Sequence, residues 1–149
     1  ELSQADVAGK VLIQSTRAGT VGVCAAGKAT EIYAASFLVA RATARELLRR
    51  APAVVTLVAM GALGKVRSDE DEQCALYLRN LLLGRQPDRD CVRKLVLAGA
   101  EAAKYGDPER PFFHAKDPEI ALQIDSLDFA MRVSREDGLL VARAVRAGA

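Results

Sequence analysis

The stretch from Ala53 to Gly84, AVVTLVAMGALGKVRSDEDEQCALYLRNLLLG, contains the two patterns that decide the expected fold. Its first eight residues, Ala53–Met60, form a nearly continuous apolar run, which is typical of a strand buried on both faces of a sheet. After Ser68 the pattern becomes helical, because apolar residues recur at spacings of three and four. This apolar stripe consists of Cys74, Tyr77, Leu78, Leu81 and Leu82. A buried strand followed by an amphipathic helix indicates a layered α/β domain.

Strands and helices are expected to alternate along the rest of the chain. Two further strands are predicted over Lys10–Gln14 and Glu31–Ser36, and a hairpin is predicted around Arg135–Gly138. Helical patterns cover residues 21–29, 37–50, 88–106 and 117–125, with Asp88 as a helix cap and Pro118 at a first helical position. We therefore expect one α/β domain over residues 1–149, built as a three-layer α/β/α sandwich with a mixed sheet.

Composition and charge exclude several classes of protein. The chain of 149 residues has a net charge of +2, and its basic residues are dispersed, which argues against a dedicated nucleic-acid-binding protein. Its apolar stretches are far too short to span a bilayer, so no membrane partner is expected. The cysteines Cys24, Cys74 and Cys91 lack metal-binding spacing, and an odd count favours the reducing cytoplasm.

Four consecutive carboxylates, Asp69 to Glu72, precede the apolar stripe of the 68–84 segment. Acidic residues stabilise the N-terminus of a helix through its dipole, but four are more than capping needs. Three roles are open: a helix cap, a solvated charge run, or a site for a hard cation such as Mg²⁺. Glu70 and Asp71 point about 100° apart on a regular helix. They could share an ion only at a frayed or capping turn, or one could bind metal while the other caps.

The segment QSTRAGT, residues 14–20, lies between an expected strand and an expected helix. In open α/β sheets ligands bind at the carboxyl ends of strands, where a following helix offers free N–H groups to an anion. Ser15, Thr16 and Thr20 add hydroxyl groups, Gly19 lets the backbone approach closely, and Arg17 offers a planar fork suited to phosphate or sulfonate. The alternative is an ordinary Ser/Thr cap beside a surface arginine.

Taken together, four stretches resemble the 2-phosphosulfolactate phosphatase family over essentially the whole chain. GKVLIQSTRAGTVGV is similar to the family's strand and Gly-Thr-ending loop, and YAASFLVARATA is similar to its strand-to-helix segment. MGALGKVRSDEDEQCALYL resembles the family's glycine-containing loop and Glu-Asp helix start. ALQIDSLDFAMRV and EDGLLVARAV resemble its closing aspartates and last strands.

The resemblance implies a Mg²⁺-dependent phosphatase that acts on a small phosphorylated acid, 2-phosphosulfolactate, on the route to coenzyme M. Carried over by position, Glu70 and Asp71 match the family's Glu-Asp pair and are expected to hold Mg²⁺ and, with Arg17, to be catalytic. Ser15, Thr16, Gly19 and Thr20 match its loop and are expected to bind substrate. Two positions depart from the family pattern, since Arg17 and Val39 stand where many members have Asn.

The start of the chain, ELSQADVAGK, is the largest departure from the family pattern. Family members carry an N-terminal Asp-Val-(Leu/Phe)-Arg-Ala-type motif, and nothing in this sequence matches it. We therefore expect residues 1–149 to be the C-terminal part of a longer chain, to fold but show little phosphatase activity alone, and to form a homo-oligomer through exposed apolar strands. The alternative function is a non-catalytic anion-binding or assembly domain.

Overall fold

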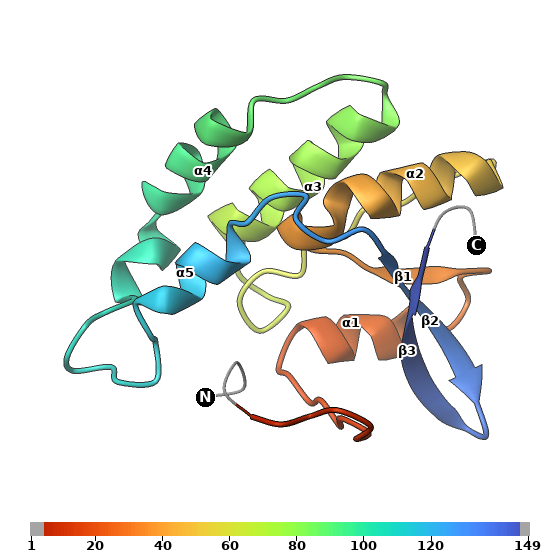
Figure 1. The fold of residues 1–149 in the computed structure, drawn as a ribbon, viewed down its shortest axis with the longest axis horizontal. Coiled ribbons are helices and arrows are strands. Elements are labelled where there is room, and N and C mark those ends of the chain that lie inside the picture. The colour runs from red at the N-terminus through yellow and green to blue at the C-terminus, as the bar shows by residue number, and fades with distance from the viewer. Residues whose placement is uncertain (1–4, 147–149) are drawn as a thin grey trace.

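The computed structural model describes residues 5–146, and Figure 1 shows the helices α2, α3 and α4 side by side, with the β2–β3 hairpin extending away from them. The expected α/β class is confirmed, because helices and strands are both present. The elements in chain order are α1 (Gly19–Ala25), β1 (Ile32–Ala34), η2 (Phe37–Val39), α2 (Ala40–Arg50), α3 (Asp69–Leu82), α4 (Arg89–Leu97), η3 (Ala100–Lys104), α5 (Lys116–Ala121), β2 (Ala130–Glu136) and β3 (Leu139–Val145). None of the helices in the described residues is long and apolar enough to cross a bilayer.

The sheet of the described residues has three strands in the order β1-β2-β3, and both pairings are antiparallel. Tyr33 of β1 lies opposite Arg132 of β2, and Val133 of β2 lies opposite Ala142 of β3. The expected mixed sheet is therefore wrong, and the three-layer arrangement is not confirmed. The predicted strand over residues 31–36 is confirmed in shortened form as β1.

Two segments predicted as strands, of which Ala53–Met60 was expected to be buried on both faces, explain this difference. Neither Lys10–Gln14 nor Ala53–Met60 forms a strand. Within the described part of the chain, the N–H of Lys10 donates to the carbonyl of Val7 at 3.1 Å, and no other residue of these two segments makes a hydrogen bond between backbone groups. Their side chains are widely exposed: Ile13 is 96% exposed and Val54 is 79% exposed. An apolar pattern predicts an extended, buried segment, but a β-ladder also requires a neighbouring strand. The exposed segments are where the expected homo-oligomer would form, and that oligomer stays a prediction.

The predicted hairpin around Arg135–Gly138 is confirmed by β2 and β3. Asp137 and Gly138 connect the strands, and both have positive φ, 48° and 83° respectively. Two such residues form the type I′ turn, whose twist matches that of the paired strands.

The helix predicted over residues 88–106 is interrupted in the structure. Asp88 caps α4 as expected, since its carboxylate accepts hydrogen bonds from the N–H groups of Asp90 and Cys91 at 2.8 and 3.0 Å. The helix ends at Leu97, and η3 follows after Gly99. Gly99 lies against α3, because a β-carbon there would sit 3.2 Å from Cβ of Asp69. This tertiary contact, which periodicity cannot show, accompanies the break.

The core forms where the apolar stripe of α3 packs against η2 and α2. Tyr77 contacts Phe37 edge-on, with ring centroids 6.1 Å apart and an interplanar angle of 64°. The buried cluster contains Phe37, Ala40, Ala44, Tyr77, Leu78, Leu81, Val96, Leu122 and Ile124, with Cys74 and Leu82 packed against it. The predicted stripe is thus confirmed.

A buried carboxylate, Asp125, joins three helices at one point. Its side chain is 1% exposed and accepts hydrogen bonds from the Tyr77 hydroxyl at 2.6 Å and from the backbone N–H of Arg41 at 2.8 Å. The guanidinium groups of Arg41 and Arg89 approach the same carboxylate at 3.2 and 3.0 Å. Burial raises the pKa of Tyr77, and its hydrogen bond to Asp125 raises it further. Helices α2, α3 and α4 are therefore fixed to one loop residue.

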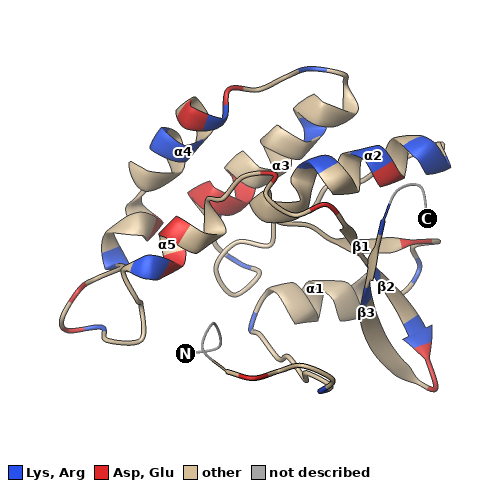
Figure 2. Cartoon of the chain, viewed as in Figure 1, with Lys and Arg blue, Asp and Glu red and all other residues tan. Residues whose placement is uncertain are grey.

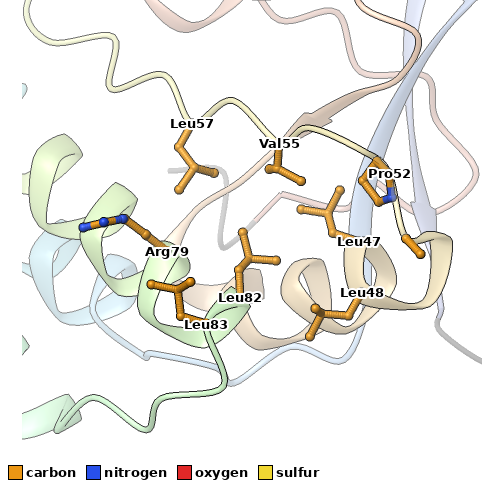
Figure 3. Close-up of a pocket in the computed structure, with 9 residues that line it drawn as sticks. Leu47, Leu48, Pro52, Val55, Leu57, Arg79, Leu82 and Leu83 are labelled. Carbon is orange, nitrogen blue, oxygen red and sulfur yellow. The ribbon is translucent and has the colours of Figure 1, made fainter.

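An apolar groove of about 490 Å³ lies between the end of α2, the end of α3 and the extended segment that follows Pro52 (Figure 3). Leucines from both helices dominate its lining, with Arg79 at one side. None of the predicted site residues lines this groove, so it is not the predicted site.

Thr43 of α2 provides a test of the packing. The residue is 1% exposed, and its hydroxyl oxygen is buried without a hydrogen-bond partner among the described residues. Thr43→Val removes this hydroxyl and keeps the shape of the side chain. We predict that the free energy of unfolding, measured by urea denaturation, rises by about 1 kcal/mol, because an unpartnered buried hydroxyl carries a desolvation cost.

Thr43→Ser is the matched control, because it keeps the hydroxyl and removes the methyl group. It should lower the free energy of unfolding by about 1 kcal/mol. If Thr43→Val is the destabilised variant instead, the hydroxyl has a partner that the described contacts do not contain.

Candidate functional site

The acidic turn at the start of α3 uses its carboxylates in different ways. Figure 2 shows the acidic first turn of this helix, which suits the positive end of the helix dipole. Glu72 forms an ion pair with Arg67, whose hydrogen bond lowers the pKa of Glu72. Glu70 accepts a hydrogen bond from the Ser68 hydroxyl at 2.6 Å. The turn is therefore more than a solvated run of charge.

Asp71 is held by the backbone of a glycine ten residues earlier. The N–H group of Gly61 donates a hydrogen bond of 2.7 Å to Oδ2 of Asp71. Gly61 has φ +64°, and a β-carbon there would lie 2.0 Å from the carbonyl oxygen of Val66. Only glycine fits this turn. The role of Gly61 was missed by the sequence prediction, although a glycine directly after an apolar run is a signal for it.

Glu70 and Asp71 line one cavity of about 200 Å³. Most of its wall is apolar and comes from η2, α3, α4, η3 and α5. The lining residues are Ala35, Ser36, Phe37, Leu38, Glu70, Asp71, Cys74, Val96, Leu97, Glu101, Ala102, Pro118, Ala121 and Leu122. The structure thus brings the two predicted metal ligands together, although neighbouring helical positions diverge.

One oxygen of Glu70 lacks a hydrogen-bond partner among the described residues. Its Oε2 atom is buried and accepts no hydrogen bond from the described residues, while Oε1 is bonded to Ser68. A buried carboxylate oxygen without a donor is costly, because it has lost its hydration. A cation in the cavity would satisfy this oxygen.

A lysine beside the cavity was not predicted from the sequence. Lys104 pairs with the cavity residue Glu101, and its ammonium group lies 4.9 Å from the ring centroid of Phe113. Burial lowers the pKa of Lys104, but the hydrogen bond and charge of Glu101 outweigh this, and the charge of Glu70 adds to them. The lysine is held as a cation near Glu70, and no sequence motif distinguishes it from other lysines.

The predicted anion loop, Ser15 to Thr20, forms a closed turn at the start of α1. Thr16 and Thr20 bond reciprocally, since the N–H of Thr20 donates to Oγ1 of Thr16 at 3.0 Å and the N–H of Thr16 donates to Oγ1 of Thr20 at 2.9 Å. These two amides are therefore already used within the loop. Ser15, Arg17 and Gly19 are exposed.

The loop and the carboxylate pair are not brought into one cavity in the described structure. The cavity lining contains no residue from Ser15 to Thr20. The loop and the carboxylate pair are connected only through α1 and Met60. The helix α1, which follows the loop, lies against the Met60 side chain, since a β-carbon at Gly22 would be 2.4 Å from the Met60 sulfur. The next residue, Gly61, is the one that holds Asp71.

Comparison with models of protein families identifies the family of this chain. A family model described as 2-phosphosulpholactate phosphatase matches residues 1–132 of the 149. The chain belongs to this family. The matched range contains both the Ser15–Thr20 loop and the Glu70–Asp71 pair, and the resemblance expected from the sequence is confirmed. Comparisons with curated proteins and with solved structures gave no match.

Within this phosphatase family member, the donor set can be tested against a metal. No group of three His, Cys, Asp or Glu side chains within residues 5–146 is arranged to hold a metal ion. Mg²⁺ is commonly held by only one or two carboxylates, with water and substrate oxygens as the remaining ligands. Glu70, with its unpartnered oxygen, and Asp71 fit that smaller requirement.

Cys74 lines the same cavity but is unsuited to act as a nucleophile. Burial, with a smaller contribution from the charge of Asp71, raises the pKa of its thiol to about 12. The thiol therefore stays protonated at neutral pH. Cys24 and Cys91, in contrast, are exposed.

This difference predicts selective thiol reactivity. In the folded protein at pH 8, an aromatic disulfide reagent should modify the exposed Cys24 and Cys91 quickly, and Cys74 on the order of a hundredfold more slowly, because burial restricts access to its thiol and raises the pKa of that thiol. Release of the coloured thiol measures each rate. Cys74→Ser is the control and should leave the fast phase unchanged. Three equal rates in the folded protein would contradict the burial of Cys74.

Proposed function

We propose that this member of the family is a Mg²⁺-dependent phosphatase that hydrolyses a phosphate monoester of a small acidic molecule resembling 2-phosphosulfolactate. The observation that carries the proposal is the unpartnered, buried oxygen of Glu70 beside Asp71 in one cavity. The family match supplies the reaction class, and the carboxylate pair supplies oxygen ligands of the kind Mg²⁺ requires.

Glu70 and Asp71 would hold the metal. Asp71 is fixed by Gly61, and Glu70 is oriented by Ser68, so contacts within the chain orient both carboxylates. When bound, Mg²⁺ would polarise phosphoryl oxygens and neutralise part of their charge. Lys104 lies near Glu70, and its charge is balanced by an ion pair with Glu101 of the cavity lining.

The exposed loop would bind the phosphorylated acid. Arg17 can donate two parallel hydrogen bonds to phosphoryl or sulfonate oxygens, and it would stabilise negative charge on the group being transferred. The hydroxyl of Ser15 adds a donor, while Thr16 and Thr20 keep the turn closed around Gly19 through their reciprocal bonds. Substrate binding by this loop would therefore depend on a turn that its own two threonines hold closed.

One observation favours the alternative of a non-catalytic anion-binding or assembly domain. The loop residues and the carboxylate pair line no common cavity, although a phosphatase must apply both to one substrate. Activity measurements separate the two functions, because only the phosphatase releases phosphate in a reaction that needs Mg²⁺.

The test is phosphate release by the natural gene product that contains these residues, with an aryl phosphate and with 2-phosphosulfolactate. Turnover should require Mg²⁺. Glu70→Gln and Asp71→Asn should each lower it by on the order of a hundredfold, as expected for loss of an electrostatic catalytic group. Both changes keep the size of the side chain, and melting temperatures check that each variant folds.

Asp69→Asn is the matched control, since it alters the same acidic turn outside the cavity lining. It should change turnover by no more than a few fold. Small and equal effects at all three positions would restore a purely capping role, and turnover unaffected by removal of Mg²⁺ would exclude the proposed metal dependence.

A further inference from the structure

The cluster around Asp125 contains more positive charge than its structural role needs. One carboxylate is contacted by two guanidinium groups, those of Arg41 and Arg89, in addition to the Tyr77 hydroxyl and a backbone N–H. A single arginine balances the charge of Asp125. The second leaves a net positive charge fixed at this point.

The geometry places the two guanidinium groups close together. Arg41 Nε and an Arg89 terminal nitrogen both contact Oδ2 of Asp125, so these nitrogens lie no more than about 6 Å apart, where like charges repel. Arg41 also donates to the side-chain oxygen of Gln86 at 3.0 Å. That acceptor is neutral, so it orients the guanidinium without removing its charge.

Both arginines also reach solvent. Their side chains are 35% and 46% exposed, whereas the carboxylate that positions them is 1% exposed. Neighbouring arginines on the same helices are paired with acids of their own, Arg45 with Asp128 and Arg93 with Asp90. Arg41 and Arg89 thus share one buried carboxylate, and the remaining part of each guanidinium-bearing side chain is accessible to solvent.

We propose that Arg41 and Arg89 form an anion-binding site for a small tetrahedral oxyanion, with Asp125 as the residue that positions them. Such an anion has several acceptor oxygens and can accept charge-assisted hydrogen bonds from both guanidinium groups at once. Neither arginine lines the Glu70–Asp71 cavity, so the site is independent of the proposed phosphatase chemistry.

Calorimetric titration with inorganic phosphate tests the site. All measurements use an Arg17→Gln background, which removes the cation of the Ser15–Thr20 loop. In that background Arg89→Gln should weaken phosphate binding about tenfold or more, because a charge-assisted hydrogen bond is lost. Arg143→Gln is the control: it removes an exposed, ion-paired arginine of β3 and should leave the affinity unchanged. Equal affinities in all of these variants would overturn the proposal.

A second measurement covers the case in which Arg89→Gln does not fold. Crystals of the unaltered protein are soaked in selenate, and its anomalous signal locates the anion. The proposal expects selenate within hydrogen-bond distance of both Arg41 and Arg89. Selenate bound only elsewhere would overturn it.

Discussion

The fold depends most on the buried carboxylate of Asp125. A buried charge is tolerated only when it is paired and fully hydrogen-bonded, and this one receives donors from α2, α3 and the first residue of α4. The N–H of Asp125 donates to the carbonyl of Phe37 at 2.9 Å, which links the loop before β2 to η2. The donors from α2, α3 and α4 each join a different helix to the same carboxylate, so the relative positions of three helices are linked to one residue. The apolar core then fills the space between them.

The same arrangement explains why Glu70 lies in a cavity. Tyr77, which reaches Asp125, stands seven residues after Glu70, so the two share one face of α3, with Cys74 between them. Docking of Tyr77 on Asp125 sets the rotation of the helix and directs Glu70 and Cys74 inward. Asp71, the next residue, points about 100° away from Glu70 around the helix axis. In that direction the N–H group of Gly61 donates a hydrogen bond to its carboxylate. If the acidic residues only capped the N-terminus of α3, the hydrogen bond between Gly61 and Asp71 would not be needed.

Local patterns in the sequence predicted much of the fold and part of the site. The stripe of α3, the Asp88 cap and the Asp137–Gly138 turn depend on nearby residues, and all three are confirmed. The sheet was predicted wrongly because an apolar run such as Ala53–Met60 does not specify which strand lies beside it. Glu70 and Asp71, which the sequence singled out, line one cavity, and their role as metal ligands stays a prediction. The roles of Gly61 and the Asp125 cluster depend on tertiary contacts that no local pattern specifies.

The central functional claim is that the acidic turn of α3 is a cation site as well as a helix start. Binding of Mn²⁺, measured by loss of the free-ion signal in electron paramagnetic resonance, tests it without reliance on turnover. We expect one Mn²⁺ per chain, displaced by excess Mg²⁺, and at least tenfold weaker binding in Glu70→Gln, because this variant lacks the charged, unpartnered oxygen. Asp69→Asn should bind as the unaltered protein does. Equal Mn²⁺ affinity in Glu70→Gln and the unaltered protein would contradict the claim.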